Sequence, residues 1–241
     1  MRALIEKLRR WEREFHESFT GEIVTERDRR RSLRYVAWID HGLLRALWHN
    51  FHEVAPGVFR SNHPDHTRLE RYAARGIRTV LSLRGARTKA FHRLEVESCA
   101  ALGLDLRVIG MGSREAPRRE ALLALLDVFD TAPRPLLIHC KSGADRTSLA
   151  SALYLIHSER ATVARARAQM SLRFIHLRWT KSGVLDEVLD LYEERQGAAP
   201  IVLREWIETE YDADAVTQSF ARRFRRRARF RARAAPEERD R

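Results

Sequence analysis

Short apolar runs alternate with amphipathic stretches through the middle of the chain. Runs of leucine, valine and isoleucine that end at glycine or at polar residues predict buried strands at 77–85, 104–111 and 133–140, with a shorter strand inside 55–64. Helical periodicity predicts helices at 65–76, 91–103, 115–132 and 146–159. Strands that alternate with helices need crossover connections, so the pattern predicts an α/β fold with a mostly parallel central sheet flanked by helices.

The two ends of the chain are predicted to be helical extensions. Residues 1–52 are amphipathic, with apolar side chains at helical spacing, and the chain beyond 161 is mainly helical. The segment 222–241 is a low-complexity basic tail whose composition cannot support a core of its own. We therefore expect three parts, which are an N-terminal helical extension (1–52), a catalytic domain (53–196), and a helical segment with the basic tail (197–241).

The net charge of the chain limits the classes of partner that it is expected to bind. Lys and Arg number 45 against 33 Asp and Glu, a formal net charge of +12. A surplus of guanidinium groups favours anionic partners such as phosphoproteins, anionic lipid or nucleic acid. No nucleic-acid motif accompanies the charge, so no specific nucleic-acid partner is expected. No signal peptide, membrane-spanning stretch or disulfide framework is present in the sequence, and we expect a cytoplasmic protein.

The main candidate catalytic residues lie in one loop. This loop joins the predicted strand 133–140 to the helix after it. The strand carries Cys140 to the carboxyl end of the sheet, where open α/β folds place their ligands, and a helix is expected to begin near Thr147. Gly143 permits a close backbone approach, and the backbone N–H groups with the helix dipole favour an anion. Arg146 adds a fork suited to phosphate oxygens, and the positive field favours a Cys140 thiolate, a phosphorus nucleophile. Cys99, on an amphipathic helix, is expected to be a packing residue.

The loop residues also resemble a known family. "HCKSGADRT" (139–147) resembles the signature loop of the cysteine-dependent protein tyrosine and dual-specificity phosphatases, and "VFRSNHP" and "TVLSLRG" resemble segments of their bacterial members. The resemblance covers roughly residues 54–160 and implies a tyrosine-phosphatase-like fold that needs no metal or cofactor. It implies a phosphocysteine on Cys140, phosphate and transition-state binding by Arg146, a Thr147 hydroxyl that helps the thiolate leave, and ordering of the loop by His139. The phosphate-binding loop would comprise Lys141, Ser142, Gly143, Ala144, Asp145, Arg146 and Thr147.

The general acid departs from the common pattern of that superfamily. Many members supply an aspartate from a separate loop about thirty residues before the cysteine, whereas here the region 108–120 contains no aspartate. Glu115 is its only carboxylate before Glu120. Asp145, inside the signature loop, is the alternative, and we favour it as the catalytic acid over Glu115.

The sequence leaves the substrate open. Lys141, together with Arg114, Arg118 and Arg119, suggests a substrate with more charge than one phosphate, although these arginines also suit an ordinary solvated surface. Packing roles are favoured for His176 and Trp179.

The leading hypothesis is a phosphomonoesterase of the tyrosine or dual-specificity type, acting on a phosphorylated protein. The alternative is a lipid-phosphate or phosphoinositide phosphatase that reaches an anionic membrane through the basic segment 220–234. That segment also fits a disordered solubilising tail. A non-catalytic phosphate- or nucleic-acid-binding protein is less favoured, because binding alone does not need the thiol.

Overall fold

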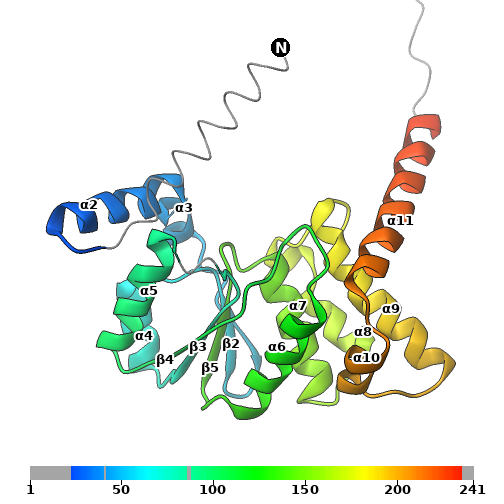
Figure 1. The fold of residues 1–241 in the computed structure, drawn as a ribbon, viewed down its shortest axis with the longest axis horizontal. Helices are drawn as coiled ribbons and strands as arrows, with labels where there is room; N and C mark the ends of the chain where they lie inside the picture. The colour runs from blue at the N-terminus through cyan, green and yellow to red at the C-terminus, as the bar shows by residue number, and fades with distance from the viewer. Residues whose placement is uncertain (1–22, 41, 86–87, 235–241) are drawn as a thin grey trace, which may run out of the picture. The chain divides into compact units, whose positions relative to one another are not determined.

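Five strands form one sheet in the part of the chain that the computed structural model describes, residues 23–40, 42–85 and 88–234. The strand order across the sheet is β1-β2-β5-β3-β4. β1 runs antiparallel to β2, and the other neighbouring pairs are parallel (Figure 1). The strands are β1 (His52–Ala55), β2 (Val58–Ser61), β3 (Thr79–Ser82), β4 (Asp105–Val108) and β5 (Leu136–His139). The α/β class and the mostly parallel sheet with flanking helices are confirmed.

The residues divide into two compact units. Unit 1 contains the described residues up to Gly110 together with Ala132–Gly143, and unit 2 contains Met111–Thr131 and the described residues from Ala144 onward. The expected domain boundaries at 52/53 and 196/197 stay predictions.

Unit 1 holds the sheet and the helices that precede its last strand. These helices are α2 (Glu26–Arg34), a π-helical turn (Tyr35–Ile39), α3 (Gly42–Leu47), α4 (His66–Ala74) and α5 (Ala90–Ala101). α4 and α5 lie side by side (Figure 1) and share a buried core with the sheet that includes Leu69, Val80, Cys99 and Leu137. Asp65 caps α4 by accepting a hydrogen bond from the Arg68 backbone N–H, which satisfies one of the donors that a helix start leaves unpaired.

Unit 2 is helical and is built around α7. Every residue of α7 from Thr147 to Ile156 is buried, and α6, α8, α9 and α10 pack against it or against one another. Its helices are α6 (Arg119–Thr131), α7 (Asp145–His157), α8 (Val163–Ala166), α9 (Val184–Ala198), α10 (Leu203–Thr209) and α11 (Ala213–Ala234), with 3-10 turns at Arg167–Gln169, Leu172–Phe174 and Lys181–Gly183. Because α7 begins at Asp145 and not near Thr147, both Asp145 and Arg146 belong to its first turn.

The helical part of 1–52 ends earlier than the sequence suggested. Helix is confirmed within Glu26–Leu47, and His52 begins strand β1 instead of ending a helix. The helix predicted before residue 23 lies outside the described residues. β1 and β2 form a hairpin around the predicted Pro56–Gly57 turn. Gly57 has a φ of +74°, which suits the second central position of a tight turn.

The C-terminal segment is helical as far as Ala234. The start of α11 packs on α9, where Arg223 Nε lies 3.4 Å from Glu187 Oε1, and the rings of Phe220 and Phe224 lie 5.5 Å apart. Of the two interpretations of 220–234, a disordered tail or an amphipathic basic segment, the structure contradicts the disordered tail, because this segment is helical. Arginine and alanine are good helix formers, and the first turns of the helix have α9 to pack on. Within the described residues, no helix has the length and apolarity that crossing a bilayer requires.

Candidate active site

Cys140 lies immediately after β5, the strand between β2 and β3. In the parallel register His139 is paired with Ser61 of β2 and with Ser82 of β3, so the three strands end together at their carboxyl edge. All four residues of β5 are buried, and Cys140 is only 1% exposed. The cysteine therefore stands where the sequence placed it, at the edge of a parallel sheet at which ligands bind.

Residues outside the loop that follows Cys140 donate hydrogen bonds to its carbonyl groups and hold it in place. The Gly143 carbonyl accepts hydrogen bonds from Arg60 Nη2 at 2.7 Å and from Asn50 Nδ2 at 2.9 Å, and Arg60 is completely buried. The Lys141 carbonyl accepts from the His63 backbone N–H at 3.2 Å. Gly143 has a φ of +70°, and a Cβ there would lie 2.7 Å from the Ser61 backbone. Only glycine fits this conformation at this distance.

A buried carboxylate links the side chain of Lys141 to two arginines. Asp40 Oδ1 lies 3.3 Å from Lys141 Nζ, and Asp40 also pairs with Arg84 at 2.7 Å and with Arg45 at 2.8 Å. Burial alone would raise the pKa of Asp40, but the hydrogen bonds and charge of Arg84, with Arg45 and Lys141, hold that pKa below its usual value. The ion pair with Asp40 therefore fixes the side chain of Lys141, the first residue after Cys140.

Two histidines face one glutamate behind Cys140. His139 Nε2 lies 2.7 Å from Glu95 Oε1, and His63 Nδ1 lies 3.5 Å from the same oxygen. All three side chains are almost fully buried. Burial, together with the nearby charge of Arg84, holds the pKa of His63 well below its usual value. The expectation that His139 orders the loop stays a prediction.

In unit 2, Asp145 is joined to a second histidine and a second aspartate. His176 Nδ1 lies 2.8 Å from Asp145 Oδ1, and His176 Nε2 lies 2.7 Å from Asp186 Oδ2. Burial would lower the pKa of His176, but its hydrogen bonds to Asp145 and Asp186 outweigh burial and raise that pKa to about 9. The sequence favoured a packing role for His176; the structure instead ties it to a candidate catalytic residue.

Arg146 and Glu115 are connected through one short segment. Arg146 Nη1 donates to the Met111 carbonyl at 3.3 Å. The side chain of exposed Glu115 folds back over Gly112, where an added Cβ would meet its carboxylate at 2.4 Å. Glu115 thus lies on the segment that accepts a bond from Arg146, and it remains the alternative acid.

Other residues singled out in the sequence have separate roles. Arg119 donates to the carbonyls of Glu208 and Tyr211 at the end of α10, so its guanidinium is held by the protein. Arg114 and Arg118 are exposed, and Trp179 is 52% exposed, so its indole is not packed in the core as expected. Cys99 is buried in the core that α4 and α5 share with the sheet, and burial, with a smaller contribution from Glu95, raises its pKa to about 12. A packing role for Cys99 is what this environment supports.

The chain was then compared with known proteins. Residues 55–182, slightly more than half of the chain, match the family model described as "DSP-PTPase phosphatase fused to NAD+ Kinase". The chain belongs to this family. This match places the chain in the superfamily of cysteine-dependent dual-specificity and tyrosine phosphatases, as the resemblance implied.

The chain is also similar to individual proteins of known sequence or structure. The chain is 34% identical over 143 residues to the protein "Inositol diphosphatase DSP1" of Oryza sativa subsp. japonica, an alignment that covers 53% of this chain and 63% of the rice protein. Among solved structures, Tk-PTP in its active form superposes with a TM-score of 0.50 at 21% identity, covering 61% of this chain and 99% of that one. The core catalytic domain of the PP-IP phosphatase SIW14 from S. cerevisiae gives a TM-score of 0.45 at 17% identity, covering 73% and 93%. At these identities the likeness to Tk-PTP shows the fold alone.

Proposed function

We propose that this phosphatase acts through a phosphocysteine intermediate on Cys140. The observation that carries the proposal is the way the loop carbonyls are held. Oxygens of Lys141, Ser142 and Gly143 all accept hydrogen bonds from His63, Asn50 or Arg60, outside the loop. A peptide N–H points opposite to its own carbonyl group, so these bonds turn the loop N–H groups away from the protein body and toward an anion.

The reaction then follows from the groups on the loop. The Cys140 thiolate attacks phosphorus, an S–P bond forms, and the bond from phosphorus to the leaving oxygen breaks. Water then attacks the phosphocysteine, releasing inorganic phosphate and the thiolate. Arg146 would bind two phosphate oxygens through its planar fork. Thr147 would stabilise the departing sulfur; its hydroxyl is fully buried and has no hydrogen-bond partner among the described residues, which fits a group that serves the reaction.

Proton transfer is assigned to Asp145 with His176. Because the pKa of His176 is raised to about 9, the imidazole is protonated at neutral pH and donates N–H bonds to Asp145 and to Asp186. We infer that Asp145 passes a proton to the leaving oxygen and later takes one from the attacking water, with His176 as the proton reserve. This pairing supports Asp145 over Glu115, which has no such partner in the described contacts.

An inositol diphosphate is the substrate class that we propose first. The rice relative is described as an inositol diphosphatase, and the basic surface suits a substrate with several phosphates. Cleaving a diphosphate releases a phosphate ester, whose second pKa is about 6, so it leaves with little help from an acid. The lack of an aspartate in 108–120 is then no obstacle to the chemistry. Phosphoproteins are the other substrate class of the dual-specificity type.

A lipid phosphate at a membrane surface is the second candidate. The observation that favours it is α11, which carries Phe220 and Phe224 one turn apart in a helix rich in arginine. Such a helix suits an anionic lipid surface.

A substrate panel tests these proposals. Phosphate release is measured side by side from an inositol diphosphate, an inositol monophosphate, a phosphotyrosine peptide and a phosphoinositide in vesicles, with the Cys140→Ser variant as the blank for each. The diphosphate should give the highest kcat/KM. A phosphotyrosine peptide that exceeds it by tenfold or more would contradict the inositol assignment and leave the cysteine mechanism standing. Equal turnover by wild type and Cys140→Ser would contradict the mechanism itself.

A further inference from the structure

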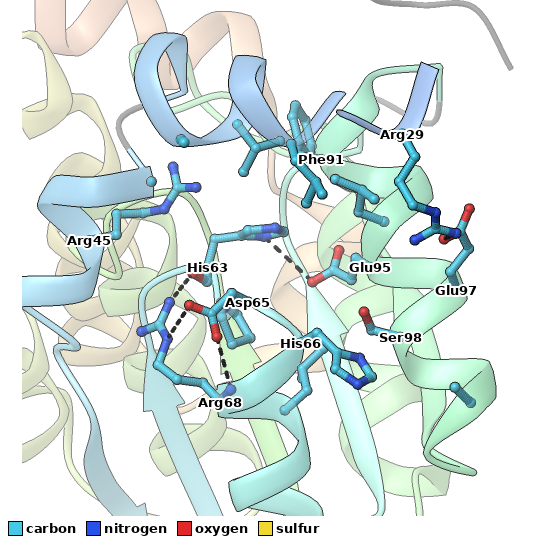
Figure 2. Close-up of a pocket in the computed structure, with 18 residues that line it drawn as sticks. Arg29, Arg45, His63, Asp65, His66, Arg68, Phe91, Glu95, Glu97 and Ser98 are labelled. Carbon is cyan, nitrogen blue, oxygen red and sulfur yellow. Dashed lines mark hydrogen bonds and ion pairs between the residues drawn. The ribbon is translucent and has the colours of Figure 1, made fainter. Parts of the chain in front are cut away.

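Unit 1 contains a cavity that lies apart from the loop of Cys140. Its volume is about 660 Å³. Apolar side chains of α2, the π-helical turn, α4 and α5 form part of its wall, and charged or polar residues make up half of the lining. His63 and Glu95 also line it and face one another across a dashed contact in Figure 2. Cavities of this size that combine apolar walls with a few converging polar groups are typical ligand sites.

The polar groups at this cavity form a cluster with His139. The ligand-type atoms of His63, Glu95 and His139 lie within 4.8 Å of one another, and all three side chains are more than nine-tenths buried. His63 Nδ1, His139 Nε2 and both carboxylate oxygens of Glu95 have no hydrogen-bond partner, although the His139 to Glu95 contact is 2.7 Å. Its geometry is therefore not that of a hydrogen bond. Buried polar atoms are rarely left in this state, and four in one cluster indicate a missing partner.

The environment of His139 favours a cation between the rings and the carboxylate. Its other ring nitrogen, Nδ1, lies 3.4 Å from the Cys140 carbonyl oxygen, which accepts a hydrogen bond only in the tautomer that carries its hydrogen on Nδ1. In that tautomer Nε2 directs its lone pair at the Glu95 carboxylate, and a positive ion between the two would remove the repulsion. Metal-binding histidines commonly hold a carbonyl oxygen with their second nitrogen in this manner.

We propose that His63, Glu95 and His139 bind a divalent transition-metal ion of the zinc type. Two imidazoles and one carboxylate are a ligand set that zinc takes with a fourth position open, and here that position would face the cavity. Ligand atoms around such an ion lie roughly 3.4 Å apart, which follows from bonds of about 2.0–2.1 Å in a tetrahedron. The His63 to Glu95 contact of 3.5 Å already fits, and the His139 to Glu95 contact needs to open by less than 1 Å.

Positive charge also lies near the cluster. Arg45, Arg84 and Lys141 share the single carboxylate of Asp40, and Arg68 Nε lies 3.8 Å from Asp65. The Glu95 carboxylate is the group of the cluster that would offset the charge of a bound cation. The ion would take no part in phosphate transfer. By fixing the ring of His139, the residue before Cys140, it would stabilise the end of β5.

Zinc titration of the full chain tests the proposal. The Cys140→Ser protein is stripped of metal with a chelator and titrated with zinc chloride by calorimetry. The substitution prevents zinc from binding to the thiol of Cys140. One zinc ion should bind per chain, and His63→Asn or Glu95→Gln should weaken binding by roughly 100-fold. His66→Asn is the matched control, because His66 lines the same cavity outside the cluster and should change nothing. Circular dichroism in chelator shows whether each variant is folded.

Cobalt substitution keeps the proposal falsifiable if a cluster variant does not fold. Cobalt bound to the Cys140→Ser protein should give visible bands of a four-coordinate site without a sulfur charge-transfer band, and zinc should raise the melting temperature of the same protein. Structural zinc sites have dissociation constants far below 10 μM. A dissociation constant for zinc above about 10 μM would therefore overturn the proposal, and the cluster would then be an ion pair without a metal. Binding that is equal in Glu95→Gln and in its parent would also overturn it, because the metal would then lie elsewhere.

Discussion

His176 Nδ1 lies 2.8 Å from Asp145 Oδ1, although 31 positions separate the two residues in the chain. The contact makes the candidate acid one end of a carboxylate–imidazole–carboxylate arrangement that ends at Asp186 on α9. The charge of Asp145 is thereby coupled to a group that titrates well above neutral pH.

The identity of the nucleophile can be tested with the two cysteines. Cys140→Ser should abolish turnover while phosphate binding is retained, because a hydroxyl is far less ionised than a thiolate. Cys99→Ser is the matched control and should remain active, since Cys99 is a buried packing residue. Activity is measured as phosphate release and binding by calorimetry with inorganic phosphate. Loss of activity in Cys99→Ser and not in Cys140→Ser would show that the nucleophile is misplaced.

The acid can be identified by changing the leaving group. Asp145→Asn should slow hydrolysis of an alkyl phosphate by ~10² to 10⁴, because the contribution of an acid grows with the basicity of the oxygen that it protonates. The same variant should be much less affected with an aryl phosphate or an inositol diphosphate. Glu115→Gln should slow all three alike or not at all. A selective loss in Glu115→Gln would reverse the two roles.

The pH dependence of stability reports on His176. Its pKa is about 9 in the folded chain and about 6.5 when unfolded, so its contribution is complete below pH 6.5 and is lost as the pH rises through 9. The loss should be on the order of 3 kcal/mol, from 1.36 kcal/mol per unit of pKa shift. Denaturant unfolding of wild type and His176→Gln at pH 6.5 and pH 9.5 measures it. The stability of His176→Gln should change less between the two values, and an equal change in both proteins would contradict the assigned charge.

The two turn glycines form a matched pair for testing the loop. Both have a positive φ, but a Cβ at Gly57 meets nothing within 4 Å, whereas a Cβ at Gly143 meets the Ser61 backbone. Gly57→Ala should cost only the backbone penalty of roughly 1 to 2 kcal/mol and keep full activity. Gly143→Ala should lose activity as well, because the loop must move away from its anchors. Thermal unfolding and phosphate release are compared; full activity in Gly143→Ala would show that the loop tolerates the shift.

The role of the C-terminal helix is separable from the chemistry. Deleting residues 225–241 keeps Arg223 and its pairs with α9. Turnover of a soluble substrate should be nearly unchanged, while sedimentation with anionic liposomes should weaken and become less dependent on salt. Equal liposome binding with and without these residues would show that the part of α11 beyond Phe224 does not bind the membrane, which leaves the lipid-phosphate candidate without its arginine-rich segment.

Local sequence patterns predicted most of the fold and the position of the loop after β5, but not the side chains that contact this loop. Strands such as β3 and β5 are fully buried, and their uninterrupted apolar runs identify them. β1 was missed because an edge strand of four residues, with one exposed and two partly buried, leaves no such run.

The contacts of the loop with residues distant in the chain could not be predicted from local sequence patterns. The partner of Asp145 is His176, which is in turn held by Asp186 of α9, and no local spacing connects either residue to the loop. Arg60 did leave a signal, since a charged residue inside a predicted buried strand needs a partner, and here the partner is Gly143.

The bonds from Arg60 and Asn50 to Gly143 have a consequence for comparing members of this family. The neighbouring positions 50 and 60 support position 143, which lies more than 80 residues later in the chain, so we expect the three positions to be inherited together. A chain that keeps the Cys-x5-Arg motif but lacks a guanidinium at the position of Arg60 would have an unsupported loop. Lysine is no substitute, since a single ammonium lacks the planar fork. Such chains would be candidates for inactive pseudophosphatases, and a motif search that adds the arginine would separate them from enzymes.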